Sequence, residues 1–212
     1  MKISKNELQD IILGNEQIGG GSQLKAAQSF LRRYAETSNP AEKQQRFKDK
    51  ETAAILNLVG QQFRYNGPLF TINDFIGEGA EQKVYRFDDT YVLKTNSGIF
   101  YECWLDYFNS LLSHNFFFPA TAYDFLGFRV TDNLTEAIVK QRFIRSNETT
   151  DLTAVKDFLD YNGFQHKRNN DYYNTELGLI FEDLHDENVL SRDGVLYFID
   201  TIFYLTPSFY VL

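Results

Sequence analysis

The spacing of hydrophobic and polar positions changes near Leu69. Before it, apolar residues recur at helical spacing in residues 8–12, 24–35 and 41–63. A glycine tract at 19–22 interrupts this pattern, and we expect a flexible turn there. It does not match a phosphate loop, because no strand precedes it and no Lys-Ser or Lys-Thr follows it. Residues 1 to about 66 are therefore predicted to be helical, without a catalytic signature.

After Leu69 the apolar runs become short, which is typical of strands. The predicted strands lie at 84–87, 91–94, 122–130 and 137–144, with turns at 88–90 and 132–133. Helices are predicted at 99–112 and at 151–161, the second with Asp151 or Thr150 as its N-cap. A polar stretch at 165–174 precedes a final strand, a loop and a hairpin. Helices followed by paired antiparallel strands indicate an α+β fold.

Composition describes a chain that folds. The 212 residues are 43% hydrophobic and 16% aromatic, including 20 Phe and 13 Tyr, so most aromatics are expected in the core. The formal net charge is −8, and no run of five basic residues occurs. Nucleic-acid binding is therefore unfavourable, because it depends on neutralising phosphates. One local basic patch lies at 165–168.

The single cysteine, Cys103, excludes an intramolecular disulfide and a multi-cysteine zinc site. It precedes Trp104 in an apolar run, so a buried, unreactive thiol is expected. No apolar stretch approaches the roughly 20 residues that cross a bilayer. The first residues turn acidic at once and lack the apolar segment of a signal peptide, so we expect a cytoplasmic protein without membrane partners.

The most informative segment is 182–190, followed by 197–200. Asp183 precedes Asn188 by five residues, and a predicted hairpin with its turn at Asp193-Gly194 leads to Asp200. Adjacent strands lie about 4.8 Å apart, so Asn188 and Asp200 are expected side by side. Mg²⁺ prefers oxygen ligands, with a few from the protein and the rest from phosphates and water. Asp183 would then orient a hydroxyl group, which is the chemistry of phosphoryl transfer.

A second group of residues suits a nucleotide. Gly77 and Gly79 lie between two strand-like runs and are followed by Val84 and Lys94. Glycine lets the backbone approach a phosphate, valine covers a flat base, and lysine pairs with phosphate oxygens. A plain hairpin is the alternative interpretation.

An acidic partner would hold Lys94 toward the phosphates. Glu102 lies on the predicted helix and is the preferred candidate, although it could equally be a solvated helical residue. Asp106, one turn further on, is its rival.

Together these motifs resemble the protein-kinase-like superfamily over residues 70–203. Gly77, Gly79 and Val84 are similar to the glycine-rich loop, and Lys94 to the strand lysine. Residues 183–190 are similar to the catalytic loop Asp-Leu-Lys-Pro-Glu-Asn-Val-Leu, and Asp200 to the metal-binding aspartate. The ending most resembles the short kinase domains found in polyvalent proteins of bacterial mobile elements and phages.

The resemblance implies ATP and Mg²⁺ as cofactors, with catalytic roles for Lys94, Asp183, Asn188 and Asp200. Asn188 and Asp200 would bind the metal. Gln141 and Phe143 fall where the interlobe hinge offers backbone groups to adenine. The implied architecture is a minimal kinase-like fold with a helical extension (1–68), an antiparallel-sheet N-lobe (69–144) and a truncated C-lobe (145–212).

The chain also departs from the kinase pattern. Gln82 stands where a third glycine is usual, and Thr201-Ile202 replaces Phe-Gly after Asp200. Phe181 and Glu182 replace the His-Arg pair, so control by a phosphorylated activation loop is not expected. Twelve residues follow Asp200 in this sequence, so we expect no activation segment and no peptide-gripping helices.

The expected function is transfer of the γ-phosphoryl group of ATP to a hydroxyl of a protein or small molecule. A nucleotide-binding module without turnover (a pseudokinase) and an AMP transferase are the alternatives. The N-terminal helices, residues 24–66, are expected to cover the back of the final hairpin or to brace the sheet. The acceptor and the oligomeric state are left open.

Overall fold

A computed structural model describes residues 4–14, 23–36, 44–59, 62–68, 70–79, 82–132 and 134–211. The glycine tract at 19–22 lies outside the described residues. The chain forms two compact units. We call residues 17–108 and 123–143 the five-strand unit, and residues 1–16, 109–122 and 144–212 the four-strand unit. Helices combine with antiparallel sheets in both, which confirms the predicted α+β class.

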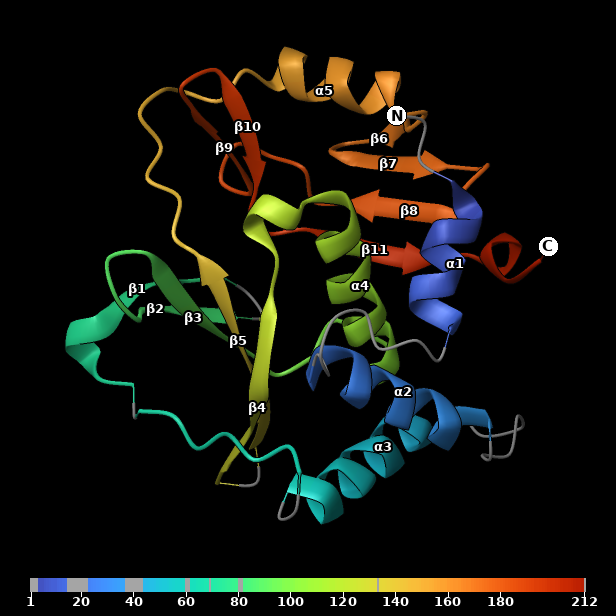
Figure 1. Ribbon diagram of the computed structural model, residues 1–212, viewed down its shortest axis with the longest axis vertical. Coiled ribbons are helices and arrows are strands. Elements are labelled where there is room, and N and C mark those ends of the chain that lie inside the picture. Colours follow the sequence, from blue (N-terminus) through green and yellow to red (C-terminus); the bar gives the residue numbers. More distant parts are fainter. Residues whose placement is uncertain are drawn as a thin grey trace. The chain divides into compact units, whose positions relative to one another are not determined.

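The five-strand unit is built on one antiparallel sheet with the order β1-β2-β3-β5-β4 (Figure 1). Its strands are β1 (Phe75–Glu78), β2 (Gln82–Arg86), β3 (Tyr91–Asn96), β4 (Asp124–Thr131) and β5 (Leu134–Arg142). The predicted turn between β2 and β3 is closed by Asp88, whose carboxylate accepts from the amides of Thr90 (2.6 Å) and Tyr91 (2.8 Å). All four strands predicted in this part of the chain are confirmed.

The N-terminal segments of this unit brace the sheet. Its first helices are α2 (Gln23–Glu36), α3 (Gln44–Val59) and the short η1 (Ile72–Asp74). On α2, Leu24, Ala27 and Leu31 are buried at helical spacing. Residues 63–65 bond to β4, because the Tyr65 amide donates to the Phe128 carbonyl at 2.9 Å. Bracing of the sheet was one of the two roles expected for this region.

The four-strand unit holds a sheet with the order β11-β8-β7-β6 and a separate hairpin, β9–β10. The sheet strands are β6 (Gln165–Arg168), β7 (Asp171–Asn174), β8 (Leu179–Glu182) and β11 (Ile202–Leu205). The hairpin strands are β9 (Val189–Arg192) and β10 (Val195–Phe198). Its helical segments are α1 (Lys5–Leu13), η2 (Pro119–Thr121), α5 (Leu152–Tyr161) and η3 (Pro207–Tyr210).

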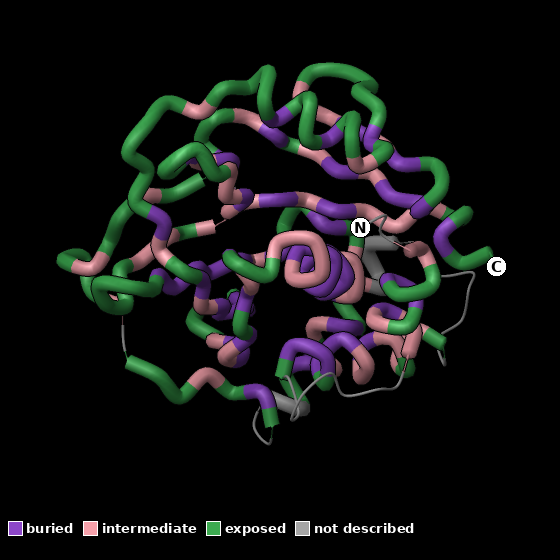
Figure 2. Tube along the Cα trace, turned by 45° about the horizontal axis from the view of Figure 1, so that its top comes forward, coloured by how far each residue is buried: buried purple, intermediate pink, exposed green. Residues whose placement is uncertain are grey.

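Along β7 and β8 more and less buried positions alternate, as expected for strands with one face on a core (Figure 2). Stacked phenylalanine rings fill that core. The ring centroids of Phe181 and Phe203 lie 4.1 Å apart, and those of Phe118 and Phe198 lie 4.2 Å apart. The expectation that aromatics populate the core is confirmed in this unit.

Helix α4 (Trp104–Phe117) passes from one unit to the other, since residues up to Phe108 belong to the five-strand unit. The prediction of a helix at 99–112 was wrong at both ends. Gly98 adopts a left-handed conformation (φ 65°), and the Tyr101 amide closes a turn onto its carbonyl. The chain therefore turns before the helix begins. Glu102, expected on the helix, lies in the bend before it.

Among the described residues, no helix combines the length and apolar character that crossing a bilayer requires.

Candidate active site

The segment between β8 and β9, residues 183–188, is the centre of the candidate site. Asp183 has a φ of 65°, a backbone conformation that is strained for a residue other than glycine. The amide of Leu184 donates to the carbonyl of Asn170 at 3.1 Å, and the Leu184 side chain is buried. The loop is thus anchored to the turn between β6 and β7. Strain of this kind is found where the surroundings impose a conformation, often at functional sites.

Asn188 links the ends of this loop. Its side-chain amide nitrogen donates to the carbonyl of Asp183 (2.8 Å) and to the Asp183 carboxylate (2.9 Å). It also lies 3.0 Å from Nε2 of His185. A carboxylate can only accept, so the nitrogen of the amide must face Asp183. The Oδ1 atom of Asn188 is therefore turned away from Asp183, which suits a role as a metal ligand.

The β9–β10 hairpin brings Asp200 to Asn188. Val189 pairs with Phe198, and the two-residue turn is formed by Asp193 (φ 53°) and Gly194 (φ 72°). Positive φ at both positions is the signature of a type I′ turn. Beyond the paired strands, the Asn188 carbonyl accepts from the amides of Ile199 (2.9 Å) and Asp200 (3.4 Å). The expected hairpin and the juxtaposition of Asn188 with Asp200 are confirmed.

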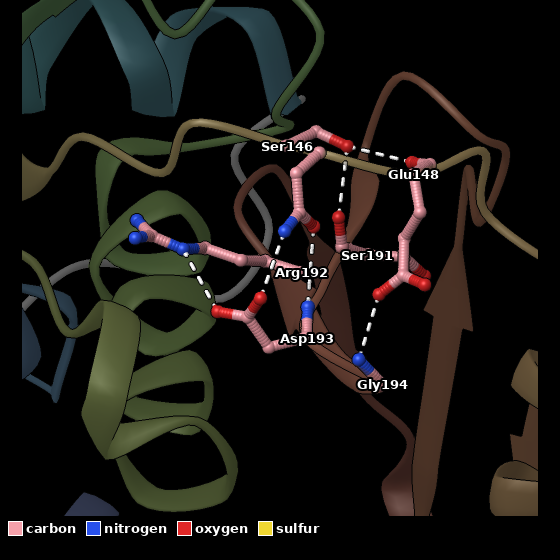
Figure 3. Close-up of polar contacts among 7 residues, drawn as sticks. Ser146, Glu148, Ser191, Arg192, Asp193 and Gly194 are labelled. Atoms are coloured by element: carbon pink, nitrogen blue, oxygen red, sulfur yellow. Dashed lines mark hydrogen bonds and ion pairs between the residues drawn. The ribbon is translucent and has the colours of Figure 1, made fainter.

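Residues 146–150 brace this hairpin, a role that no pattern in the sequence indicates. Figure 3 shows Ser146, whose hydroxyl donates to the Ser191 carbonyl (2.8 Å), and Glu148, whose carboxylate accepts from the Gly194 amide (2.7 Å). Asn147 donates to the Asp193 carboxylate (2.8 Å) and accepts from the Asp193 amide (3.2 Å).

Thr150 continues this bracing. Its hydroxyl donates to the Val189 carbonyl at 2.7 Å, so it does not cap α5. The N-cap of α5 is Asp151, which accepts from the Thr153 amide at 2.8 Å. The two alternatives for this N-cap are thus resolved in favour of Asp151.

In the five-strand unit, Gly77 and Gly79 lie at the connection between β1 and β2. Gly77 pairs with Val84, and the Gly79 amide donates to the Gln82 carbonyl at 2.9 Å. A Cβ atom added to either glycine would meet no described atom within 4 Å. Neither glycine has a positive φ. Within the described residues, then, neither backbone conformation nor packing requires glycine at these positions.

Lys94 is buried on β3, with 4% of its surface exposed. It pairs directly with Val84 on β2 and with Val139 on β5. Directly opposite residues project from the same face of an antiparallel sheet. Val84 and Lys94 therefore share a face, as expected for a base-covering valine and a phosphate-binding lysine. The ring of Tyr123 lies 5.6 Å from Nζ of Lys94.

The two rival acidic residues have different environments. Glu102 is exposed. Asp106 is on the first turn of α4 and accepts from the thiol of Cys103 at 3.1 Å. Burial is the main cause that raises the pKa of Asp106, and it also raises that of the half-buried Cys103. The pairing of Lys94 with Glu102, and not with Asp106, stays a prediction.

At the expected hinge, Gln141 is buried on β5. The amide of Phe143 donates to the Thr90 carbonyl at 2.7 Å, and the Arg86 guanidinium lies over its ring. An adenine bound here would therefore have to bond to the backbone carbonyl groups of residues 141–143, or to displace the hydrogen bond between the Phe143 amide and the Thr90 carbonyl.

The sequence model of one protein family matches residues 48–207, which is most of the chain. This family is described as the serine/threonine/tyrosine kinase found in polyvalent proteins. The chain belongs to this family. The resemblance inferred from the motifs is thereby confirmed. No curated protein and no solved structure matches the chain.

Membership of a kinase family implies use of a nucleotide and usually of a metal ion. The described part of the chain holds no group of three or more His, Cys, Asp or Glu side chains that could bind a metal by themselves. Asn188 and Asp200 instead offer a partial set of oxygen ligands. That set fits Mg²⁺, which usually takes one or two carboxylates and completes its shell with phosphates and water.

The segment that matches the kinase family begins inside α3. Two residues of α3 form hydrogen bonds with the backbone at and just before the start of α4. The carboxylate of the fully buried Glu51 accepts from the amides of Trp104 (2.7 Å) and Leu105 (3.4 Å). Lys48 donates to the carbonyls of Gly98 and Tyr101. Burial raises the pKa of Glu51 to about 7, although the two amide bonds act to lower it. No sequence pattern near α4 could have revealed a cap that comes from another helix.

Proposed function

We propose that this chain transfers the γ-phosphoryl group of ATP to a hydroxyl of a protein or small-molecule acceptor, with Mg²⁺. In this assignment the sheet region 69–144 is the nucleotide lobe and residues 145–212 form the catalytic lobe. Residues 1–68 are the extension that supports them. Lys94 contacts the phosphates, Val84 covers the base, and Gln141 and Phe143 lie beside the adenine.

The observation that carries the proposal is the linkage of Asp183, Asn188 and Asp200. One residue, Asn188, bonds to the Asp183 carboxylate through its side chain and to the Asp200 amide through its carbonyl. Asn188 thus connects the Asp183 carboxylate with the backbone of Asp200, and a purely structural loop has no need for this arrangement of polar residues. The cost of such an arrangement is offset when a cation and a phosphate use it.

The glycines give independent support. Gly77 and Gly79 lack side chains at positions where the described residues leave space for a Cβ atom. A close approach of ligand phosphates to the backbone explains this choice, because a Cβ atom would hold the phosphates away. We therefore assign these two positions to the phosphate contact.

Asp183 acts on the acceptor. Its side chain is about half exposed, at 54%, so a hydroxyl can reach it. Asn188 fixes one carboxylate oxygen, and Nε2 of His185 lies 3.3 Å from the other. Asp183 thus accepts a hydrogen bond from the attacking hydroxyl and orients it, while His185 keeps the carboxylate in place.

Most of the rate enhancement in such a reaction comes from placement and from stabilising charge. When bound, Mg²⁺ would neutralise the charge that develops on the phosphoryl oxygens. Asn188 and Asp200 are the residues assigned to hold it.

The experiment is incubation with α-labelled ATP and Mg²⁺, with labelled ADP separated from labelled AMP-modified acceptor. Asp183→Asn and Asp200→Ala should each reduce ADP formation by about a hundredfold or more, while circular dichroism shows an intact fold. Glu187→Gln, an exposed position in the same loop, is the matched control and should keep activity.

Unchanged turnover in either aspartate variant would refute the assignment. Release of pyrophosphate, with AMP attached to the acceptor, would identify nucleotidyl transfer. Binding of ATP with no product would identify a pseudokinase that works as a nucleotide-dependent switch.

A further inference from the structure

A buried histidine lies next to the residue that follows Asp200. His114, on α4, has no exposed surface. Its Nδ1 atom lies 2.7 Å from the hydroxyl of Thr201, and its Nε2 atom lies 2.9 Å from the carbonyl of Thr121. All three residues belong to the four-strand unit.

The partners of the ring fix its tautomer. A carbonyl oxygen can only accept, so Nε2 must carry the hydrogen and donate to Thr121. In the neutral ring Nδ1 is then the acceptor, and the Thr201 hydroxyl donates to it. The imidazole thus holds Thr201 in one defined direction. Metal-binding histidines are oriented in a comparable way, because a hydrogen bond from the second ring nitrogen fixes the tautomer and the direction of the ring.

Thr121 extends this contact to the other side of Asp200. Its hydroxyl donates to the Phe198 carbonyl at 2.6 Å, and the Phe198 ring stacks on Phe118. Phe198 and Thr201 flank the two residues Ile199 and Asp200. The backbone of this pair is therefore held before and after it, while the Asn188 carbonyl accepts from both of its amides.

We propose that His114, Thr121 and Thr201 form a clamp that positions Asp200 for metal binding. This inference rests on the proposed function, because it assigns Asp200 the metal. Burying three linked polar side chains costs desolvation free energy, whereas apolar side chains at these positions would not carry that cost. Packing alone therefore does not explain why these residues are polar. His114 is a positioning residue, since it acts through Thr201 and contacts no reacting atom.

The test compares Thr201→Val, which keeps the shape and removes the hydroxyl, with Thr201→Ser, which keeps the hydroxyl. Each protein is titrated with Mg²⁺ in the presence of a non-hydrolysable ATP analogue, and the melting temperature is recorded. Ser113→Ala is the control. Like Thr201, Ser113 is a buried hydroxyl residue, but it lies on α4 and donates to the helix carbonyl of Asn109.

The clamp predicts that Thr201→Val raises the half-saturating Mg²⁺ concentration by about tenfold or more. Thr201→Ser and Ser113→Ala should stay near the wild-type value. Binding of the analogue without Mg²⁺ should not change in any variant. A merely structural role would lower the melting temperature of Thr201→Val without moving its Mg²⁺ dependence.

Two outcomes separate this proposal from the function on which it rests. If the wild type responds to Mg²⁺ and Thr201→Val has the same half-saturation, the clamp is overturned and the kinase assignment stands. If the wild type shows no Mg²⁺-dependent response, both are overturned. A ¹⁵N NMR spectrum of the wild type provides a check that needs no variant, since a His114 ring protonated on Nδ1 alone would contradict the clamp.

Discussion

The side-chain amide of Asn188 donates to the carboxylate of Asp183 at 2.9 Å, across the 183–188 loop. The bond depends on an amide, because a carboxylate at position 188 would have no hydrogen to donate. It therefore fixes which atom of Asn188 faces away from Asp183. Removing the donor while keeping the shape of the side chain is the sharpest test of this relationship.

Asn188→Asp should destabilise the metal-free protein by about 1–3 kcal/mol, because a hydrogen bond becomes a contact between two carboxylates. Adding Mg²⁺ without nucleotide should raise the melting temperature of this variant more than that of the wild type, since Mg²⁺ neutralises the added charge. Asn66→Asp adds the same charge at an exposed position and is the control. A variant that melts like the wild type in both conditions would show that the bond does not constrain the loop.

Gly77→Ala and Gly79→Ala should weaken binding of a Mg²⁺–ATP analogue, measured by calorimetry, and change stability by less than about 1 kcal/mol. The contrast is Gly178→Ala, where φ is 71° and a Cβ atom would lie 2.4 Å from the Phe209 amide nitrogen. The free energy of unfolding of that variant should fall by several kcal/mol. If Gly77→Ala destabilises the fold as strongly, or binds the analogue normally, the phosphate assignment of this glycine is wrong.

Glu51 should make stability depend on pH. Burial raises its pKa to about 7, from an ordinary value of 4.5, so in this range the folded protein binds the proton more tightly than the unfolded chain. The stabilisation is complete below about pH 4.5 and is lost as the pH rises toward 7. The loss amounts to at most roughly 3 kcal/mol.

Urea denaturation of the wild type and Glu51→Gln at pH 5, 6, 7 and 8 measures this effect. The stability of the wild type relative to the variant should fall across this range, because glutamine does not titrate. A difference that is constant with pH would mean that Glu51 stays charged in the folded protein and caps α4 as a carboxylate throughout.

The sequence predicted the features that local chemistry determines. The Asp193-Gly194 turn between two apolar runs was sufficient to place β9, β10 and the contact of Asn188 with Asp200. Likewise Asp151 was identified as a candidate N-cap from its position before a helical pattern.

Other features depend on residues far along the chain or on unusual turn residues. The start of α4 is set by Glu51, more than fifty positions earlier, so the periodicity of 99–112 placed the helix too early. The stretch 165–174, for which no strand was predicted, forms the β6–β7 hairpin. Its strand pattern is hidden because all four β6 residues are exposed, and its turn relies on Asn169 with a φ of 48°.

The bracing of the hairpin by residues 146–150 was also outside the reach of sequence patterns. These exposed polar residues resemble an ordinary loop, and their partners on β9 and at the hairpin turn are some 40 positions away. Only the register of the hairpin brings them together.

A crystal structure with Mg²⁺ and a non-hydrolysable ATP analogue would show directly whether Asn188, Asp200 and Lys94 meet at one nucleotide. We expect a Mg²⁺ ion about 2.1 Å from Oδ1 of Asn188 and from the Asp200 carboxylate. The same structure should show phosphate oxygens bonded to Lys94 and close to the Gly77 and Gly79 backbone. A nucleotide bound elsewhere, or a Lys94 ammonium group directed away from its phosphates, would rule out this phosphotransfer site.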